Sequence, residues 1–393
     1  MNVATRQTHG VALGGLIALA AAMGIGRFVY TPILPFMVDG LGLTQAQAGL
    51  IASANFFGYL LGALAAAMSH VPGGQRRWFL GALAISALTT GAMGLVESLP
   101  SFLALRFIGG VASAFVLVFS SALVLERLAE AGRPGLSAMH FAGVGTGIAV
   151  SALLVSWLAA SGAGWVGLWL WSGALSLCAL FGVAWLVPPR PEPKHGADAT
   201  PSDGADRRLI ALIAAYGLFG FGYVITATFI NALVRLSPEI SAIEPVVWLA
   251  VGLAAVPSVA LWTWIGRALG NARSFAVACL VEAVGVAMSV LADSAISVLI
   301  AAALLGGTFM GITALGLLHA RALSGGNPRR SLALMTAAFG LGQMIGPSFA
   351  GVAHDFTGSF VVPTLAASVA LVVAALLVGL GKPSAQPQDL KNA

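Results

Sequence analysis

Residues 24–37, GIGRFVYTPILPFM, lie inside the first long apolar run of the chain, yet they include an arginine, a tyrosine, a threonine and two prolines. An arginine near the centre of a bilayer costs between about 2.5 and 17 kcal/mol, so one that persists there normally faces a protein interior or a water-filled cavity. Pro32 and Pro35 each remove a backbone donor, so we expect the helix to bend just beyond Arg27. A bent, polar helix among apolar helices predicts a solute pathway.

The composition of the chain indicates an integral membrane protein. Of its 393 residues, 59% are hydrophobic and 8% are charged, and the mean hydropathy is +0.94. The net charge is +5, but the 19 Lys and Arg residues are spread along the chain without a basic-aromatic stripe, so we expect no nucleic-acid partner. Cys178 and Cys279 both lie in apolar runs, which excludes a disulfide framework and a CxxC metal site.

Twelve apolar runs are long enough to cross a bilayer as helices. One long polar stretch, residues 188–208, divides them six and six, and its Pro, Gly and charged residues predict a disordered cytoplasmic linker. We therefore expect a six-helix bundle over 1–187 and a second over 209–393, which ends in a short cytoplasmic tail. The predicted spans are residues 11–38, 45–69, 77–96, 101–125, 135–160, 165–187, 209–232, 246–266, 274–292, 296–320, 332–353 and 359–381.

Lysine and arginine are distributed unevenly between the two ends of the predicted helices. If the N-terminus is cytoplasmic, 16 of the 19 basic residues lie in or beside cytoplasmic segments. The exceptions are Arg27 and Arg106, which lie inside helices, and Arg235 on the far side. The positive-inside rule then places both termini in the cytoplasm, and we expect a multi-pass protein of the bacterial inner membrane.

The two halves of the chain are similar to each other at an offset of about 196 residues, which predicts a duplicated six-helix unit. Parallel repeats of this kind place a substrate site near the midplane, where the halves meet. The matching segments are 24–27 (GIGR) with 220–223 (GFGY), 109–110 (GG) with 306–307 (GG), and 143–145 (GVG) with 340–342 (GLG).

With these features the sequence resembles the major facilitator superfamily of transporters over essentially its whole length. Residues 24–37, followed by ASANFFGYLLGALAA at 52–66, are similar in particular to the YbfB/YjiJ group. The superfamily motif Gly-x3-Asp-Arg-x-Gly-Arg-Arg is only partly kept, because residues 73–77 read GGQRR and Ser69-His70 stand where the acid is expected. The second copy, GRALGNAR at 266–273, also lacks the acid, which puts a charge-relay gate in doubt. The resemblance implies alternating access, with helices 1, 4, 7 and 10 lining the cavity.

Arg27 and Arg106 are the leading candidates for contact with a substrate. At 1.5 Å per residue, Arg27 lies about 24 Å into the hydrocarbon core from one side and Arg106 about 8 Å from the other, so both fall in the outer third. Two cations at similar depth, on helices that the resemblance places beside the cavity, could hold an anionic group by charge-assisted hydrogen bonds. Alternatively, each could reach the outer surface or tie helices together through backbone carbonyls.

Several neutral polar residues complete the predicted substrate site. Tyr30 follows Arg27 by three residues, and Asn55 and Tyr59 share a helix face. Gln343 lies at mid-depth, but its flanking glycines favour close helix packing. Interfacial anchoring and interhelical hydrogen bonds explain these residues about as well as ligand contact does. The predicted set is Arg27, Tyr30, Asn55, Tyr59, Arg106, Tyr223, Thr226, Asn231 and Gln343.

Two residues are candidates for proton coupling. Glu282, about 12 Å into helix 9, is the only carboxylate predicted near mid-bilayer, and burial disfavours its charged form. The resemblance places helix 9 at the periphery, however, so a structural hydrogen bond is the competing interpretation. His140, early in helix 5, titrates near neutral pH, although a packed core histidine is the simpler interpretation.

The sequence contains no P-loop, no HExxH and no nucleophile elbow with acid and histidine in order, so we expect neither an enzyme nor an ATP-driven pump. We predict a secondary transporter, a symporter or antiporter, for a small organic solute that is anionic or zwitterionic. We expect it to act as a monomer in the lipid bilayer, without cofactor or metal. The alternatives are efflux of hydrophobic or cationic compounds, which predicts a cavity acid, and a non-transporting membrane sensor or scaffold, which predicts a soluble domain.

Overall fold

The computed structural model describes residues 3–67, 74–189, 207–292, 294–324 and 328–379. Within these ranges the secondary structure is helical, without strands, and 12 helices are long and apolar enough to cross a membrane. A helix satisfies its backbone polar groups without water, which suits it to a bilayer. The predicted all-α membrane fold is therefore confirmed.

The first six spans form one bundle. The first span is interrupted, the fourth contains a π-helical turn, and the others are single helices apart from short 3-10 turns. In order, the elements are α1 (Val3–Leu19), η1 (Ala20–Ile25) and α2 (Tyr30–Leu41); α3 (Gln45–Ala66); α4 (Gln75–Ala92) and η2 (Met93–Leu95); α5 (Leu99–Ser120), η3 (Ser121–Leu125) and α6 (Glu126–Glu130); η4 (Pro134–Leu136) and α7 (Ser137–Ala160); and α8 (Trp165–Leu186).

The last six spans form the second bundle, and each is built on one long helix. In order, the elements are α9 (Arg207–Arg235); η5 (Ser241–Ile243) and α10 (Glu244–Leu269); α11 (Asn271–Leu291); α12 (Ala295–Leu323); α13 (Pro328–Thr357); and α14 (Val361–Gly379).

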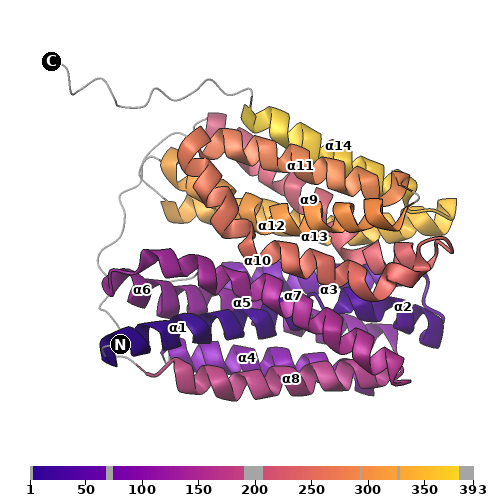
Figure 1. The fold of residues 1–393 in the computed structure, drawn as a ribbon, viewed down its shortest axis with the longest axis horizontal. Coiled ribbons are helices and arrows are strands. Elements are labelled where there is room, and N and C mark those ends of the chain that lie inside the picture. The colour runs from indigo at the N-terminus through magenta and orange to yellow at the C-terminus, as the bar shows by residue number, and fades with distance from the viewer. Residues whose placement is uncertain (1–2, 68–73, 190–206, 293, 325–327, 380–393) are drawn as a thin grey trace.

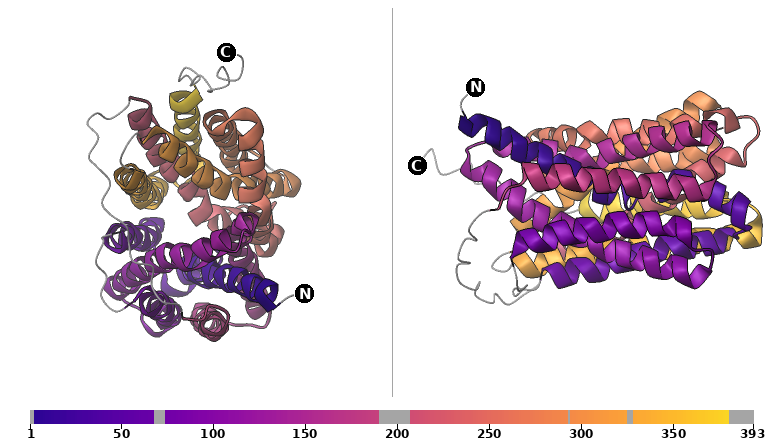
Figure 2. Two further views of the ribbon diagram at one scale, coloured as in Figure 1. Left: turned by 90° about the vertical axis from the view of Figure 1, so that its left-hand side faces the viewer. Right: turned by 90° about the horizontal axis from the view of Figure 1, so that it is seen from below.

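The two bundles lie side by side, the first in indigo to magenta and the second in pink to yellow (Figure 1). The start of α1 and the end of α14 lie at the same end of the molecule, as an even number of spans requires, and the left view of Figure 2 looks from that side. We call it the termini end and the opposite one the distal end. Most of the predicted linker, residues 190–206, and the tail from 380 onward lie outside the described residues.

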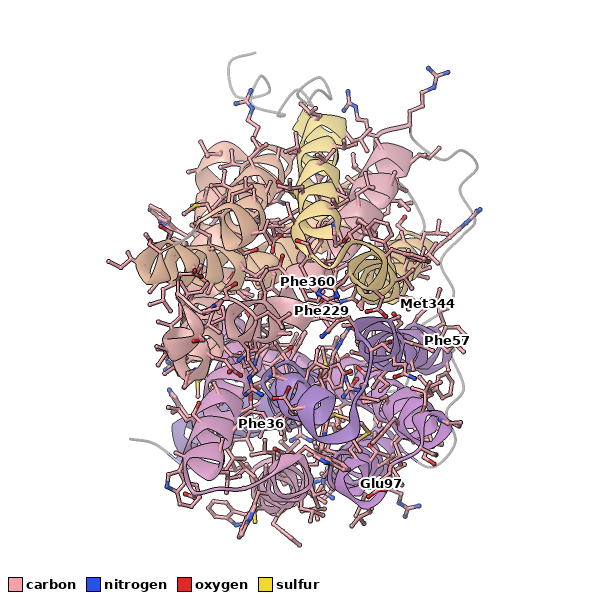
Figure 3. All side chains as sticks on the ribbon, turned by 90° about the vertical axis from the view of Figure 1, so that its right-hand side faces the viewer. Phe36, Phe57, Glu97, Phe229, Met344 and Phe360 are labelled. Carbon is pink, nitrogen blue, oxygen red and sulfur yellow. The ribbon has the colours of Figure 1, made fainter. Side chains whose placement is uncertain are left out.

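The bundles meet where α3 packs on α13 and α7 packs on α10. At the first contact, a Cβ on Gly49 would strike the carbonyl oxygen of Pro347, and one on Gly351 would strike the carbonyl oxygen of Gln45. Glycine is therefore required on both helices for this approach, as in other close contacts between membrane helices. Figure 3, which looks onto the distal end, shows Phe57 of α3 and Met344 of α13 at the boundary between the bundles.

The first span differs from the single bent helix predicted. It widens into the π-helical turn η1, residues 26–29 leave the helix, and α2 starts again at Tyr30. The predicted position of the bend, beyond Arg27, is wrong, because the interruption includes Arg27 itself. Pro32 falls in the first turn of α2, where a missing backbone donor costs little, and the Phe28 carbonyl accepts instead from the N–H of Thr31 at 3.2 Å.

Candidate functional site

The interruption of the first span holds Arg27 inside the protein, where its side chain is 3% exposed. The guanidinium carbon lies 4.2 Å from the ring centroid of Tyr59, 4.5 Å from that of Phe56 and 5.4 Å from that of Phe28. Nη2 donates to Oε1 of Gln343 at 2.8 Å, while Nε has no partner among the residues that the structure describes. No carboxylate in the described ranges forms a salt bridge with it. Rings and one neutral amide therefore hold this charge.

Gln343 connects the two bundles at the level of Arg27. Its Oε1 accepts from Arg27 and its Nε2 donates to the Tyr223 hydroxyl. Arg27 precedes α2, Tyr223 lies on α9 and Gln343 on α13, so three spans from both bundles meet here. The sequence favoured a packing role for Gln343, whereas the structure places its amide on the arginine. We call Arg27, Tyr59, Tyr223 and Gln343 the Arg27 site.

A stack of aromatic rings forms the wall of the Arg27 site in the second bundle. The Tyr223 ring is nearly parallel to those of Phe309 and Phe339, with centroids 5.6 and 5.9 Å away and interplanar angles of 10° and 6°. Phe309 also lies 6.1 Å from Phe28 of the first bundle. Sequence reasoning missed these phenylalanines, because aromatic residues in apolar helices carry no signal that separates an inward from a lipid-facing position.

Arg106 of α5 is also buried, at 4% exposure, but its partners differ. Its Nη1 donates to the carbonyl of Gly26 at 3.1 Å and its Nη2 to the carbonyl of Arg27 at 3.0 Å. The turn at residues 26–29 leaves these two carbonyls without helical N–H partners. The guanidinium of Arg106 donates to them in place of the missing backbone N–H groups. Of the two roles expected from the sequence, this geometry corresponds to tying helices together through backbone carbonyls.

Tyr30 and Asn55 lie around Arg106. The guanidinium carbon of Arg106 is 5.0 Å from the centroid of the Tyr30 ring, whose hydroxyl donates to the Ala48 carbonyl at 2.8 Å. Asn55 donates from Nδ2 to the backbone carbonyl of Arg106 at 2.9 Å. These two predicted substrate contacts are thus engaged with backbone, and they support the arginine that holds the interrupted span.

Comparison with known proteins agrees with this architecture. The sequence profile of the family described as "Uncharacterised MFS-type transporter YbfB" matches residues 19–379. The chain belongs to this family. A search of curated proteins found no significant match. Among solved structures, that of a mutant of the nucleoside transporter NupG is similar, with a TM-score of 0.72, 14% identity, and 94% of this chain and 99% of that chain covered.

At 14% identity the structural similarity establishes the major facilitator fold alone. The family match confirms the predicted resemblance, and it makes the chain a multi-pass membrane transporter and not an enzyme.

The remaining predicted residues of the transporter lie apart from the Arg27 site, and their roles stay predictions. Thr226 is buried on α9, and its hydroxyl has no hydrogen-bond partner within the described ranges. Asn231, nearer the distal end, donates to the Glu244 carbonyl at 3.3 Å. His140 is fully buried and packs against α1 at Gly15, and Glu282 is fully buried on α11. Within the described ranges, no group of three His, Cys, Asp or Glu side chains could hold a metal ion.

Proposed function

We propose that the chain is a secondary transporter that moves a small organic anion or zwitterion across the bacterial inner membrane by alternating access, driven by a proton gradient. The observation that carries this proposal is Arg27, a guanidinium that is 3% exposed between two bundles and has no salt bridge to a carboxylate in the described ranges. A planar guanidinium in this setting matches the geometry of a carboxylate or phosphate.

Binding of an anion at Arg27 would compete with Gln343. The Nη2 that an anion needs for a two-pronged contact now donates to Gln343, while the adjacent Nε has no partner in the described part of the chain. A bound carboxylate would therefore displace the amide and weaken the link from Arg27 through Gln343 to Tyr223. That link joins the two bundles, so a ligand that breaks it would bind with different affinity to two different arrangements of the bundles. A ligand shifts a conformational equilibrium only if its affinity differs between the two states.

Hydrogen bonds across the boundary support a state that is closed at the distal end. Arg235 donates from Nη1 to Asp39 of the other bundle at 2.8 Å and from Nε to Glu244 at 2.7 Å. Asp355 of α13 accepts from the backbone N–H of Gln45, at the start of α3, at 3.1 Å. The positive-inside distribution assigns the distal end to the outside, so we infer that this state is closed toward the outside.

Replacing Arg235 by glutamine is expected to favour opening at the distal end, because an ion-paired arginine that joins two acids is lost. An exposed pair contributes up to about 1 kcal/mol, so the open population should rise about fivefold. The measurement is the labelling rate of Ala227→Cys, a 5% exposed position at the boundary, by a membrane-impermeant maleimide in a Cys178→Ser background.

The same background without Ala227→Cys corrects for reaction at Cys279, which is buried. Arg133→Gln is the matched control for the loss of an arginine, since Arg133 is exposed in a loop. Equal labelling rates with and without Arg235→Gln would contradict the role of this ion pair in closure.

Counterflow in proteoliposomes tests the proposed function directly. Vesicles with the purified chain are preloaded with unlabelled solute and offered trace labelled benzoate, glutamate, uridine or tetraphenylphosphonium, in separate experiments. We expect transient accumulation of benzoate or glutamate and none in vesicles without protein. Exchange of tetraphenylphosphonium alone would favour efflux of hydrophobic cations. Exchange of uridine alone, a neutral solute, would contradict a role of the Arg27 charge in substrate recognition. Binding of an anion without any exchange would favour the sensor.

A further inference from the structure

Glu282 lies on α11, outside the Arg27 site, and its environment is unusual for an acid. The side chain is fully buried, and neither carboxylate oxygen has a hydrogen-bond partner among the described residues. The Thr308 hydroxyl of α12 lies beside it, but that hydroxyl donates to the backbone carbonyl of Leu304 at 2.6 Å. In an apolar interior the neutral form of an unpaired carboxyl group is strongly favoured over the anion.

The helices packed against α11 offer no countercharge to Glu282. These helices are α12, α14, α9 and α10. No Asp, Glu, Lys, Arg or His occurs at residues 209–234 of α9, 245–266 of α10 or 295–318 of α12, so the titratable side chains around Glu282 are Cys279, one turn earlier on α11, and Tyr223 of α9. Helix α14 has no acidic, basic or histidine residue between Val361 and Gly379. Ionisation of Glu282 would thus require α11 and its neighbours to move apart and admit water.

Helix α12 connects Glu282 with the Arg27 site. Thr308 lies beside Glu282, and the next residue, Phe309, stacks on Tyr223 with ring centroids 5.6 Å apart. Tyr223 in turn accepts from Gln343, the amide that holds Arg27. A shift of α12 that exposes Glu282 would also displace the ring against Tyr223, so both sites contact the same helix.

We propose that Glu282 is the proton-carrying group of the transport cycle and that α12 links it to the Arg27 site. This inference rests on the proposed function and adds the residue that couples it to protons. In each cycle the O–H bond of the Glu282 carboxyl breaks and its proton passes to water on one side of the membrane, and a proton from water on the other side restores the acid. His140 packs against Gly15 of α1 and against Phe141, and neither residue belongs to the Arg27 site.

The test uses the full chain in proteoliposomes with Glu282→Gln, which keeps the shape of the neutral acid but cannot release a proton. Counterflow of glutamate, which needs no net proton movement, should stay within about twofold of wild type, while accumulation of glutamate driven by a pH gradient should fall about tenfold or more. Glu282→Asp should restore part of the accumulation. Glu97→Gln, at an exposed distal loop position (Figure 3), is the matched control.

Infrared difference spectroscopy of the same variants as the pH is changed gives a readout that needs no solute. We expect a carbonyl band of a protonated carboxyl group that responds to pH in wild type and is absent in Glu282→Gln. Wild-type accumulation by Glu282→Gln, or a pH-responsive band that survives the substitution, would overturn the proposal. If wild type exchanges neither anion, the proposed function fails, and the band alone then decides whether Glu282 exchanges its proton.

Discussion

Replacing Arg27 by glutamine is expected to weaken binding of an organic anion about 30-fold or more, because removing one partner of a buried, hydrogen-bonded charge pair typically costs about 2–5 kcal/mol. The rings of Tyr59 and Phe56 and the Gln343 amide already fix the guanidinium in place, so little ordering remains for the ligand to impose. The measurement is the shift of the melting temperature with benzoate or glutamate concentration, together with counterflow of the same anion.

A folding defect can be separated from this loss of binding. Glutamine at position 27 removes a buried charge that has no ionic partner in the described ranges, so the melting temperature without ligand should not fall. Arg27→Lys keeps the charge but loses the planar fork, and intermediate binding is expected. If Arg27→Gln binds and exchanges every anion that wild type accepts, the substrate site lies elsewhere.

Replacing Arg106 by methionine is expected to cause a large loss of stability, unlike Arg27→Gln, which is expected to lose ligand binding without loss of stability. Hydrogen bonds from a charged donor are worth about 1.5–3 kcal/mol each, and Arg106 makes two of them, to the carbonyls of Gly26 and Arg27. Their loss should destabilise the fold by about 3–6 kcal/mol and release the interrupted first span. The measurement is the unfolding midpoint in detergent at a fixed scan rate, since unfolding of such proteins is commonly irreversible.

Arg133→Met serves as the control for Arg106→Met, because Arg133 is exposed in the loop before α7. Arg106→Lys should recover part of the stability, since an ammonium can still donate to one or both carbonyls. An unfolding midpoint of Arg106→Met equal to that of wild type would show that the two hydrogen bonds do not hold the first span in place.

The two arginines show how far sequence reasoning reaches at this site. Both are predictable as intramembrane cations, because each is an isolated charge in an apolar run. Their difference is not predictable, since it depends on the interruption at residues 26–29, which leaves two carbonyls within reach of Arg106 and aims Arg27 at Gln343. Proline positions predict a bend but not its register, because Pro32 can be accommodated in the first turn of a new helix.

The internal duplication of the sequence predicts residue contacts that the composition of the chain does not. At an offset of 196 residues Arg27 corresponds to Tyr223, and the structure joins these two through Gln343. Asp39 and Arg235, separated by the same 196 residues, form an ion pair at the distal end. Equivalent positions of two similar bundles meet at the boundary between them, so a repeat found in the sequence indicates which residues can face each other.

Hydropathy and the spacing of charges along the chain are enough to predict twelve spans in two bundles, because a bilayer penalises every long segment that is not an apolar helix, whatever its neighbours. The partners of each buried polar group follow from how the spans pack, and packing depends on contacts such as those of Gly49 and Gly351 between residues about 300 positions apart. The roles of Gln343, Phe309 and Glu282 likewise follow from how the spans pack. Each depends on which helix face turns inward, and in a helix that is apolar all round no periodicity marks that face.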